Sequence, residues 1–204
     1  MIRSTMTAMR RTASASSAGR RGAASGRNRV RIIAGKWRSR LVSFPPAAEL
    51  RPTPDRVRET LFNWLGQRLD GLACLDLFAG SGALGFEALS RGAASVVMVE
   101  SDREVARALL ESARLLEAEG VEVVQSDALK YLARARGKFD VVFLDPPFAS
   151  DLALRAMALL PGLMNPGACV YVESAAALEP PPSWRRLRDD RAGAVRYALY
   201  EPSP

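Results

Sequence analysis

From residue 72 onward the chain alternates between short apolar runs and segments with helical periodicity, and no other feature restricts the fold as much. Continuous apolar runs are typical of strands that are buried on both faces of a parallel sheet. Such alternation predicts an α/β fold around a doubly wound, mostly parallel sheet. The predicted strands are Cys74–Phe78, Ser95–Val99, Val121–Gln125, Phe139–Leu144 and Cys169–Glu173, and the predicted helices are Leu84–Ser90, Asp102–Glu117, Ala128–Arg134 and Asp151–Leu160.

The segment ahead of this alternation predicts a small appendage. Val30–Ala34 and Trp37–Val42 alternate in polarity and predict a hairpin that turns at Gly35-Lys36. Thr53-Pro54 predicts the start of a helix, with threonine as the N-cap and proline in the first helical position.

The tail predicts a closing antiparallel pair, Trp184–Arg188 and Ala194–Tyr200, joined at Gly193. The chain thus divides into three parts. These are an arm over residues 1–29, an N-terminal hairpin and helix over 30–70, and the main domain over 71–204.

Positive charge is concentrated at the front of the chain. Residues 1–29 contain seven arginines and no acidic residue, residues 30–60 carry a net charge of +4, and residues 61–204 sum to −4. A basic front predicts a polyanionic partner such as nucleic acid. The composition of residues 1–29 predicts a disordered basic arm, with a transit segment or a start codon assigned too far upstream as alternatives.

The composition also excludes several kinds of chemistry. The chain has no histidine, which excludes Ser-His-Asp and Cys-His nucleophiles, histidine metal ligands and a histidine base. Cys74 and Cys169 are the only cysteines, which excludes a disulfide framework and a cysteine-rich zinc site, so no metal is expected. No uninterrupted apolar run reaches the roughly 18 residues of a membrane span, so no membrane partner is expected.

A glycine-rich loop follows the first predicted strand. Asp76–Gly85 contains a G-x-G-x-x-G pattern between a strand and a helix, and Glu100 ends the next strand. This arrangement suits a dinucleotide and suits adenosylmethionine equally well, because both place a ribose against a carboxylate at the second strand.

Two further acids favour adenosylmethionine. Asp76 lies just ahead of the glycines, where a carboxylate suits a cationic aminoacyl tail and repels a pyrophosphate. Asp127 follows the third strand, where it could accept a hydrogen bond from an adenine amino group. Its plain alternative is the N-cap of the next helix, and both roles can hold at once.

The motif that most strongly indicates a reaction is Asp145-Pro146-Pro147-Phe148, at the carboxyl end of the fourth predicted strand. The prolines remove two backbone donors and stiffen the loop, which leaves a carboxylate and a carbonyl as acceptors. Hydrogen bonds to these acceptors would favour a pyramidal amino nitrogen on a base, whose lone pair could then attack a sulfonium methyl group. Phe148 would stack on the flipped base.

These motifs resemble, in order, those of class I adenosylmethionine-dependent amino-methyltransferases. The upstream segments Arg31–Arg38 and Leu50–Trp64 are similar to those of the bacterial 16S rRNA guanine-N2 methyltransferase family that modifies guanine 966. The resemblance runs from about Val30 to about Glu201. It implies a Rossmann-like, seven-stranded methyltransferase sheet with an antiparallel C-terminal strand and an N-terminal hairpin and helix appendage.

The resemblance also implies a site. The catalytic residues would be Asp145, Pro146, Pro147 and Phe148. S-adenosylmethionine would be bound by Asp76, Phe78, Gly80, Ser81, Gly82, Glu100, Ser101, Asp127 and Ala128, with Arg51, Thr53 and Arg56 near its methionine end. RNA phosphates would be bound by Arg31, Lys36, Arg38 and Arg40.

The expected partner is 16S rRNA in a small-subunit ribonucleoprotein particle, bound by a monomer in the cytoplasm. Three other functions stay open on the residues alone. They are adenine-N6 or other nucleic-acid amino-methylation, NAD-dependent oxidoreduction, and non-catalytic RNA binding in ribosome assembly. The oxidoreductase is disfavoured, since the chain has no residue set for hydride transfer and Asp76 would repel a pyrophosphate.

Overall fold

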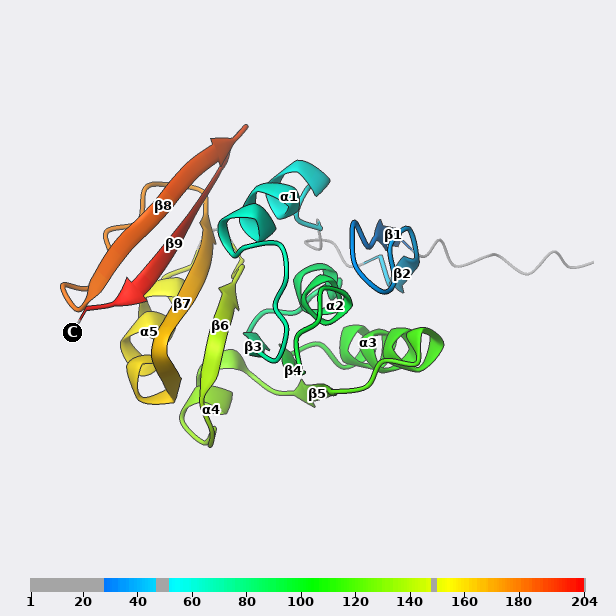
Figure 1. The fold of residues 1–204 in the computed structure, drawn as a ribbon. Helices are drawn as coiled ribbons and strands as arrows, with labels where there is room; N and C mark the ends of the chain where they lie inside the picture. Colours follow the sequence, from blue (N-terminus) through cyan, green and yellow to red (C-terminus); the bar gives the residue numbers. More distant parts are fainter. Residues whose placement is uncertain (1–27, 47–51, 148–149, 204) are drawn as a thin grey trace, which may run out of the picture.

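The computed structural model describes residues 28–46, 52–147 and 150–203, which form a sheet covered by helices on both faces (Figure 1). The sheet has seven strands in the order β5-β4-β3-β6-β7-β9-β8. Its parallel strands are β3 (Ala73–Asp76), β4 (Ser95–Glu100), β5 (Val121–Gln125), β6 (Phe139–Leu144) and β7 (Met164–Ser174). The doubly wound sheet predicted from the alternation is confirmed.

The tail closes the sheet as predicted. Strand β9 (Val195–Pro202) pairs antiparallel with β7, and β8 (Trp184–Ala192) pairs antiparallel with β9 at the edge. Both strands are longer than the sequence pattern predicts.

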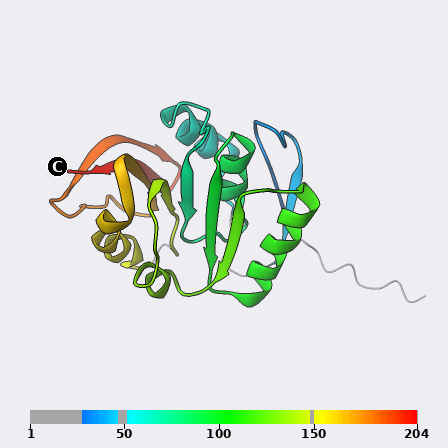
Figure 2. The ribbon, with the colours of Figure 1, turned by 60° about the horizontal axis from the view of Figure 1, so that its bottom comes forward.

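The helices form two layers, each with its own apolar core (Figure 2). Core residues of α1 (Asp55–Trp64), α2 (Ala83–Ser90) and α3 (Arg103–Leu116) pack against one face of the sheet. Those of α4 (Ala128–Leu132) and α5 (Leu152–Leu159) pack against the other, where the short 3₁₀ turn Pro161–Leu163 leads into β7. None of the helices in the described ranges is long and apolar enough to cross a membrane.

The N-terminal hairpin exists, but its predicted strands are wrong. Strands β1 (Asn28–Arg31) and β2 (Leu41–Phe44) pair antiparallel, and a long loop joins them in place of a tight turn. This loop bonds to α2, because the N–H groups of Ile33 and Ala34 donate to the Glu87 carboxylate. Gly35 is required there: its φ is +81°, and a Cβ would lie 1.7 Å from the carbonyl oxygen of Ser90.

Several other boundaries depart from the prediction, among them those of β3, which ends at Asp76 rather than Phe78, and α4, which ends at Leu132 rather than Arg134. Thr53 is not the N-cap of α1, since Pro54 occupies that position without a side-chain bond and the Thr53 hydroxyl is turned toward Asp145. Strand β7 begins at Met164 rather than Cys169, because its first residue pairs with Phe139 ahead of an irregularity in the β6–β7 register. The predicted arm lies outside the described residues except for Asn28 and Arg29, which open β1.

Candidate active site

The site lies where the chain order of the strands reverses. From β3 the chain passes to β4 and β5 on one side, then returns to β6 on the other. Ligands of doubly wound sheets bind outside the carboxyl ends of the strands at this point. Asp76, Asp145 and Glu173 lie at or just beyond the carboxyl ends of the neighbouring strands β3, β6 and β7.

The glycine loop is held by the two acids predicted to face the cofactor. The Gly85 N–H donates to Asp76 Oδ2 at 3.0 Å, and the Gly80 N–H donates to Glu100 Oε2 at 3.0 Å. Gly80 and Gly82 have φ values of +48° and +75°, in the left-handed region that favours glycine. The sharp turn into α2 therefore depends on these residue types.

The acidic groups beside this loop fit the amine and the hydroxyl groups of adenosylmethionine. Asp76 provides a buried carboxyl group for a cationic amine, and Glu100 provides a partly buried one that can accept from hydroxyl groups. Phe78 is partly buried, Ser81 is buried, and Ser101 is exposed beside Glu100.

Asp127 is the N-cap of α4, which is the alternative role predicted for it from the sequence. Its carboxylate accepts from the N–H of Lys130 at 2.9 Å, at the start of α4. The side chain is exposed, while Ala128 after it is buried.

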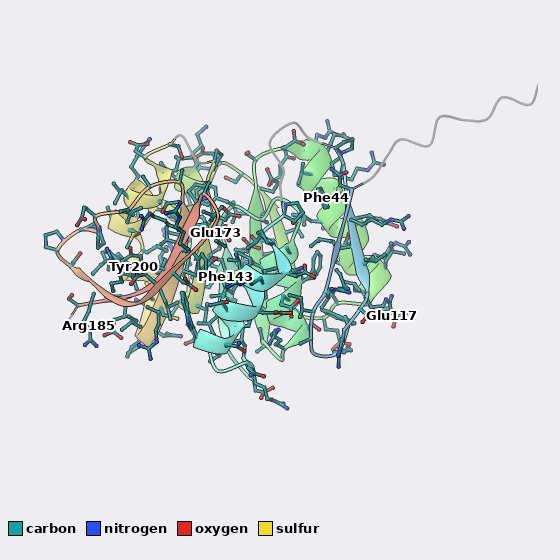
Figure 3. The ribbon with its side chains drawn as sticks, turned by 90° about the horizontal axis from the view of Figure 1, so that it is seen from above. Phe44, Glu117, Phe143, Glu173, Arg185 and Tyr200 are labelled. Carbon is teal, nitrogen blue, oxygen red and sulfur yellow. The ribbon has the colours of Figure 1, made fainter. Side chains whose placement is uncertain are left out.

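Beside the glycine loop, a hydroxyl group joins two acids. The Thr53 hydroxyl lies 3.4 Å from Asp145 Oδ2, and it also faces the carboxyl group of Glu173. The Tyr171 hydroxyl donates to Glu173 Oε1 at 2.9 Å. In the view from above (Figure 3), Glu173 lies in the middle of the molecule, away from its rim.

The three acids of this end of the sheet have raised pKa values. Burial raises the pKa of Asp76 to about 7, and the charges of Asp145 and Glu100 add to the effect of burial. Burial also raises the pKa of Asp145 to about 6, against the Thr53 bond, which lowers it. Burial, followed by the charge of Asp145, raises the pKa of Glu173 to about 8.

A buried ionic network holds α1 against α2 beside these acids. The Arg58 side chain is fully buried and donates to Asp55 Oδ1 at 2.6 Å, to Glu87 Oε2 at 3.4 Å and to the carbonyl oxygens of Thr53 and Arg31. Arg91 adds a second cation to Glu87, at 2.7 Å. This network fixes Thr53 through its backbone.

Four residues of this region were not predicted from the sequence: Arg58, Glu87, Tyr171 and Glu173. Two signals could have found some of them. Glu173 ends an apolar strand as Glu100 does, and Glu87 interrupts the otherwise apolar helix α2. Nothing in the local pattern marks Arg58 or Tyr171 as part of a site.

The remaining predicted site residues are spread out. Arg31 pairs with Asp55 at 2.9 Å, beside the start of α1. Arg40 donates to the carbonyl oxygen of Leu115 near the end of α3. Lys36 lies over the Trp37 ring, and its N–H donates to the carbonyl oxygen of Ser90, at the end of α2 that is remote from the glycine loop. Arg56 is exposed, and its charge acts on Asp190.

The motif Asp145-Pro146-Pro147-Phe148 is described only as far as Pro147. Pro146 is buried and Pro147 is exposed. Arg51 and Phe148, both predicted site residues, lie outside the described residues. Within the described ranges, no group of three or more cysteine and acidic side chains is arranged to hold a metal ion.

Comparison with known proteins adds a family and a fold. The family model described as conserved hypothetical protein 95 matches residues 30–201. Ribosomal RNA small subunit methyltransferase D of Escherichia coli K12 is 44% identical over 182 residues, which cover 87% of this chain and 92% of that protein.

Two solved structures support the fold assignment. The Escherichia coli protein YhhF matches with a TM-score of 0.78 and 43% identity, over 86% of this chain and 99% of that one. The ribosomal protein L11 methylase of Lactobacillus delbrueckii matches with a TM-score of 0.63 over 81% of this chain and 86% of that one, at 18% identity, a level that shows the fold alone. The sheet is that of a Rossmann-like methyltransferase, as the resemblance implied.

Proposed function

The chain belongs to the family described as conserved hypothetical protein 95, and from that membership we propose that it methylates the exocyclic N2 amino group of a guanine in 16S ribosomal RNA. S-adenosylmethionine is the proposed methyl donor. The relative named above supports methylation of small-subunit rRNA. The observation that carries the proposal is the position of Asp145-Pro146-Pro147 at the strand-order reversal, next to Asp76 and the glycine loop.

The chain's own residues position the reacting groups. Asp76 would bind the cationic amine of the methyl donor, and Glu100 its ribose hydroxyls. When bound, the donor supplies an electrophilic methyl group on a sulfonium centre. Asp145 and the Pro146 carbonyl would accept the two N–H bonds of the guanine amino group.

Those two hydrogen bonds orient the nitrogen lone pair toward the methyl group. The guanine nitrogen would take the methyl group from the sulfonium sulfur, with adenosylhomocysteine as the leaving group. One proton then leaves the methylated nitrogen to solvent. Catalysis by positioning and electrostatics agrees with a chain that has no histidine.

The substrate is expected to be an assembled particle. Arg31, Lys36, Arg38 and Arg40 are exposed and would contact phosphates, which position RNA without reading its sequence. A small surface of this kind needs a folded ribonucleoprotein to select one base. We propose that residues 30–70 dock on RNA and residues 71–204 carry the reaction, in a monomer acting in the cytoplasm.

The test is methyl transfer from radiolabelled S-adenosylmethionine to undermodified small ribosomal subunits, followed by identification of the labelled nucleoside. N2-methylguanosine is the expected product, with slower labelling of naked rRNA. Labelled N6-methyladenosine would show that the acceptor base is adenine rather than guanine. Tight adenosylhomocysteine binding without any labelling would favour the non-catalytic assembly role.

The role of Asp145 is tested by Asp145→Ala, which removes one acceptor of the amino group. We expect the variant to bind adenosylhomocysteine and to lose at least a hundredfold in kcat. Full methylation by this variant would contradict the mechanism.

A further inference from the structure

Glu173 is a buried acid that the mechanism above does not use. It ends β7 with 2% of its surface exposed. Tyr171, two residues earlier on the same face of the strand, donates its hydroxyl proton to Glu173 Oε1. Placing an acid in the interior is unfavourable unless its charge is matched or its proton is retained.

Among the residues that the structure describes, no cation is paired with Glu173. The ion pairs among the described residues do not include Asp76, Asp145 or Glu173. The other groups that face the pair formed by Glu173 and Tyr171 are two acids, Asp145 beyond β6 and Asp76 on β3, and the Tyr197 ring on β9. The guanidinium of Arg58 donates to the backbone carbonyl of Thr53 and to the acids of its own network.

The Thr53 hydroxyl lies between the two acids and has a single proton to donate. If both acids were ionised, two carboxylates would compete for that proton in a low-dielectric interior. If Glu173 is neutral, its own proton goes to Thr53 Oγ, and the Thr53 proton is free for Asp145. A proton on Asp145 in place of Glu173 would satisfy the same hydrogen bonds, but it would make Asp145 a weaker, neutral acceptor for the substrate amino group. The proposed amino-methylation therefore selects the arrangement in which Glu173 is neutral.

We propose that Glu173 is a positioning residue that stays protonated and, through the hydroxyl of Thr53, holds Asp145 as the ionised acceptor of the substrate amino group. One oxygen of Asp145 then accepts from Thr53, and the other faces the base. The direction of the hydrogen bonds, from Tyr171 to Glu173 to Thr53 to Asp145, is what fixes that orientation.

This inference rests on the proposed amino-methylation and predicts a pH dependence. When Glu173 loses its proton, the Thr53 hydroxyl is shared between two anions and Asp145 loses its fixed orientation. Activity should therefore fall as pH rises through the pKa of Glu173, which its burial and the charge of Asp145 raise. The fall should appear in kcat and not in KM, since ionisation of Glu173 does not alter the residues that contact substrate phosphates or the glycine loop.

The decisive variant is Glu173→Gln, because an amide reproduces both contacts of a neutral acid: its oxygen accepts from Tyr171 and its nitrogen donates to Thr53. We expect kcat at pH 7 within about threefold of the parent and no decline between pH 7.5 and 9, where the parent kcat falls. Glu173→Leu should lose about a hundredfold in kcat with KM unchanged. Glu59→Gln, an exposed change on α1, is the matched control and should keep the parent profile.

Two results would overturn the proposal: a Gln variant as inactive as the Leu variant, or a Gln variant that keeps the alkaline decline. A readout without turnover separates this proposal from the proposed function. Carbon-13 NMR of labelled glutamate carboxyls, assigned by loss of the Glu173 signal in Glu173→Gln, should show Glu173 protonated at pH 7. An ionised signal at pH 7 would refute the proposal whether or not rRNA is the substrate.

Discussion

Asp76 illustrates how a single buried acid combines a structural contact with a binding role. It accepts from the Gly85 N–H, and in the free protein its pKa is raised to about 7, first by burial. A cationic ligand favours the ionised form, so ligand binding and loss of the proton are linked. Affinity for a ligand with an ammonium group should then depend on pH over the range in which Asp76 titrates.

We predict that adenosylhomocysteine binds more tightly as pH rises from 5.5 to about 7, with up to a tenfold gain per pH unit, and that the affinity is level from 7 to 8. Asp76→Asn should bind more weakly and show no such rise. Isothermal titration calorimetry at several pH values measures both. A parent affinity that does not change over this range would show that the ligand amine does not meet Asp76.

The same acid affects stability with a definite sign. Since the folded-state pKa of Asp76 lies above its ordinary value of 3.8, the folded state binds more protons than the unfolded state between about pH 4 and pH 7. Its contribution to the free energy of unfolding is therefore greatest at acid pH and is lost as pH rises toward 7. We expect the Tm of Asp76→Asn, relative to the parent, to rise from pH 5 to pH 7.5. Thermal scans of unliganded protein test this, and a constant difference would contradict it.

At the scale of elements, the contact between α1, α2 and the N-terminal hairpin depends on polar groups as well as apolar packing. The Glu87 carboxylate accepts from the N–H groups of Ile33 and Ala34 and from the guanidinium groups of Arg58 and Arg91. A buried pair is destabilising to break, because the group that remains is charged and only partly matched.

We predict that Arg58→Met lowers the free energy of unfolding by about 3 kcal/mol or more. Adding Glu87→Gln should restore part of the loss, because the amide oxygen still accepts from the backbone while the buried charge is gone. Urea unfolding of both variants measures the coupling. Equal stability of Arg58→Met and the parent would show that the network does not hold these elements together.

The hairpin loop offers a second test at this scale. Gly35→Ala should destabilise the protein by about 3 kcal/mol, because the new Cβ would meet the Ser90 carbonyl at a residue with positive φ. Gly137→Ala is the matched control: its φ is +102° and nothing lies within 4 Å of the new Cβ, so about 1 kcal/mol of backbone strain is expected. Equal losses, measured by urea unfolding, would indicate that backbone strain alone requires Gly35.

At the scale of the whole molecule, the exposed positive charges of the hairpin loop lie at a distance from the glycine loop. Lys36 and Arg38 are exposed on the hairpin loop, which bonds to Ser90 at the end of α2. The glycine loop lies at the other end of this eight-residue helix, about 12 Å away at 1.5 Å per residue. A ribosomal subunit extends well beyond that distance, so one particle can contact both ends.

We predict that Lys36→Ala combined with Arg38→Ala weakens binding to small subunits and reduces the slope of log affinity against log salt by about two. Arg136→Ala with Lys138→Ala, exposed cations ahead of β6, should leave the slope unchanged. Filter binding at several salt concentrations compares them. If the hairpin variant leaves this slope unchanged, Lys36 and Arg38 are solvent-exposed charges that do not contact RNA phosphates.

The sequence by itself determined the parts of this protein that depend on local pattern. Strand and helix alternation follows from residues close together in the chain, and the parallel sheet follows from it, as do the positions of the glycine loop and of Asp145 at strand ends. Asp145 and Asp76 come together because parallel strands share one carboxyl edge. The predicted hairpin strands and the Thr53 cap were wrong, since contacts with α2 and with Asp145 replaced the local ones.

Only the tertiary structure decided which polar groups share the interior. Thr53 meets Asp145 across 92 positions of sequence, and Glu87 meets the hairpin backbone across 53 and 54. No periodicity encodes such pairs, because any donor or acceptor of suitable length could serve. Their identity is set when folding removes water, since each buried polar group must then find its partner among the residues that the topology brings near. That requirement brought Glu173 and Tyr171 to the acid that the sequence had marked, Asp145.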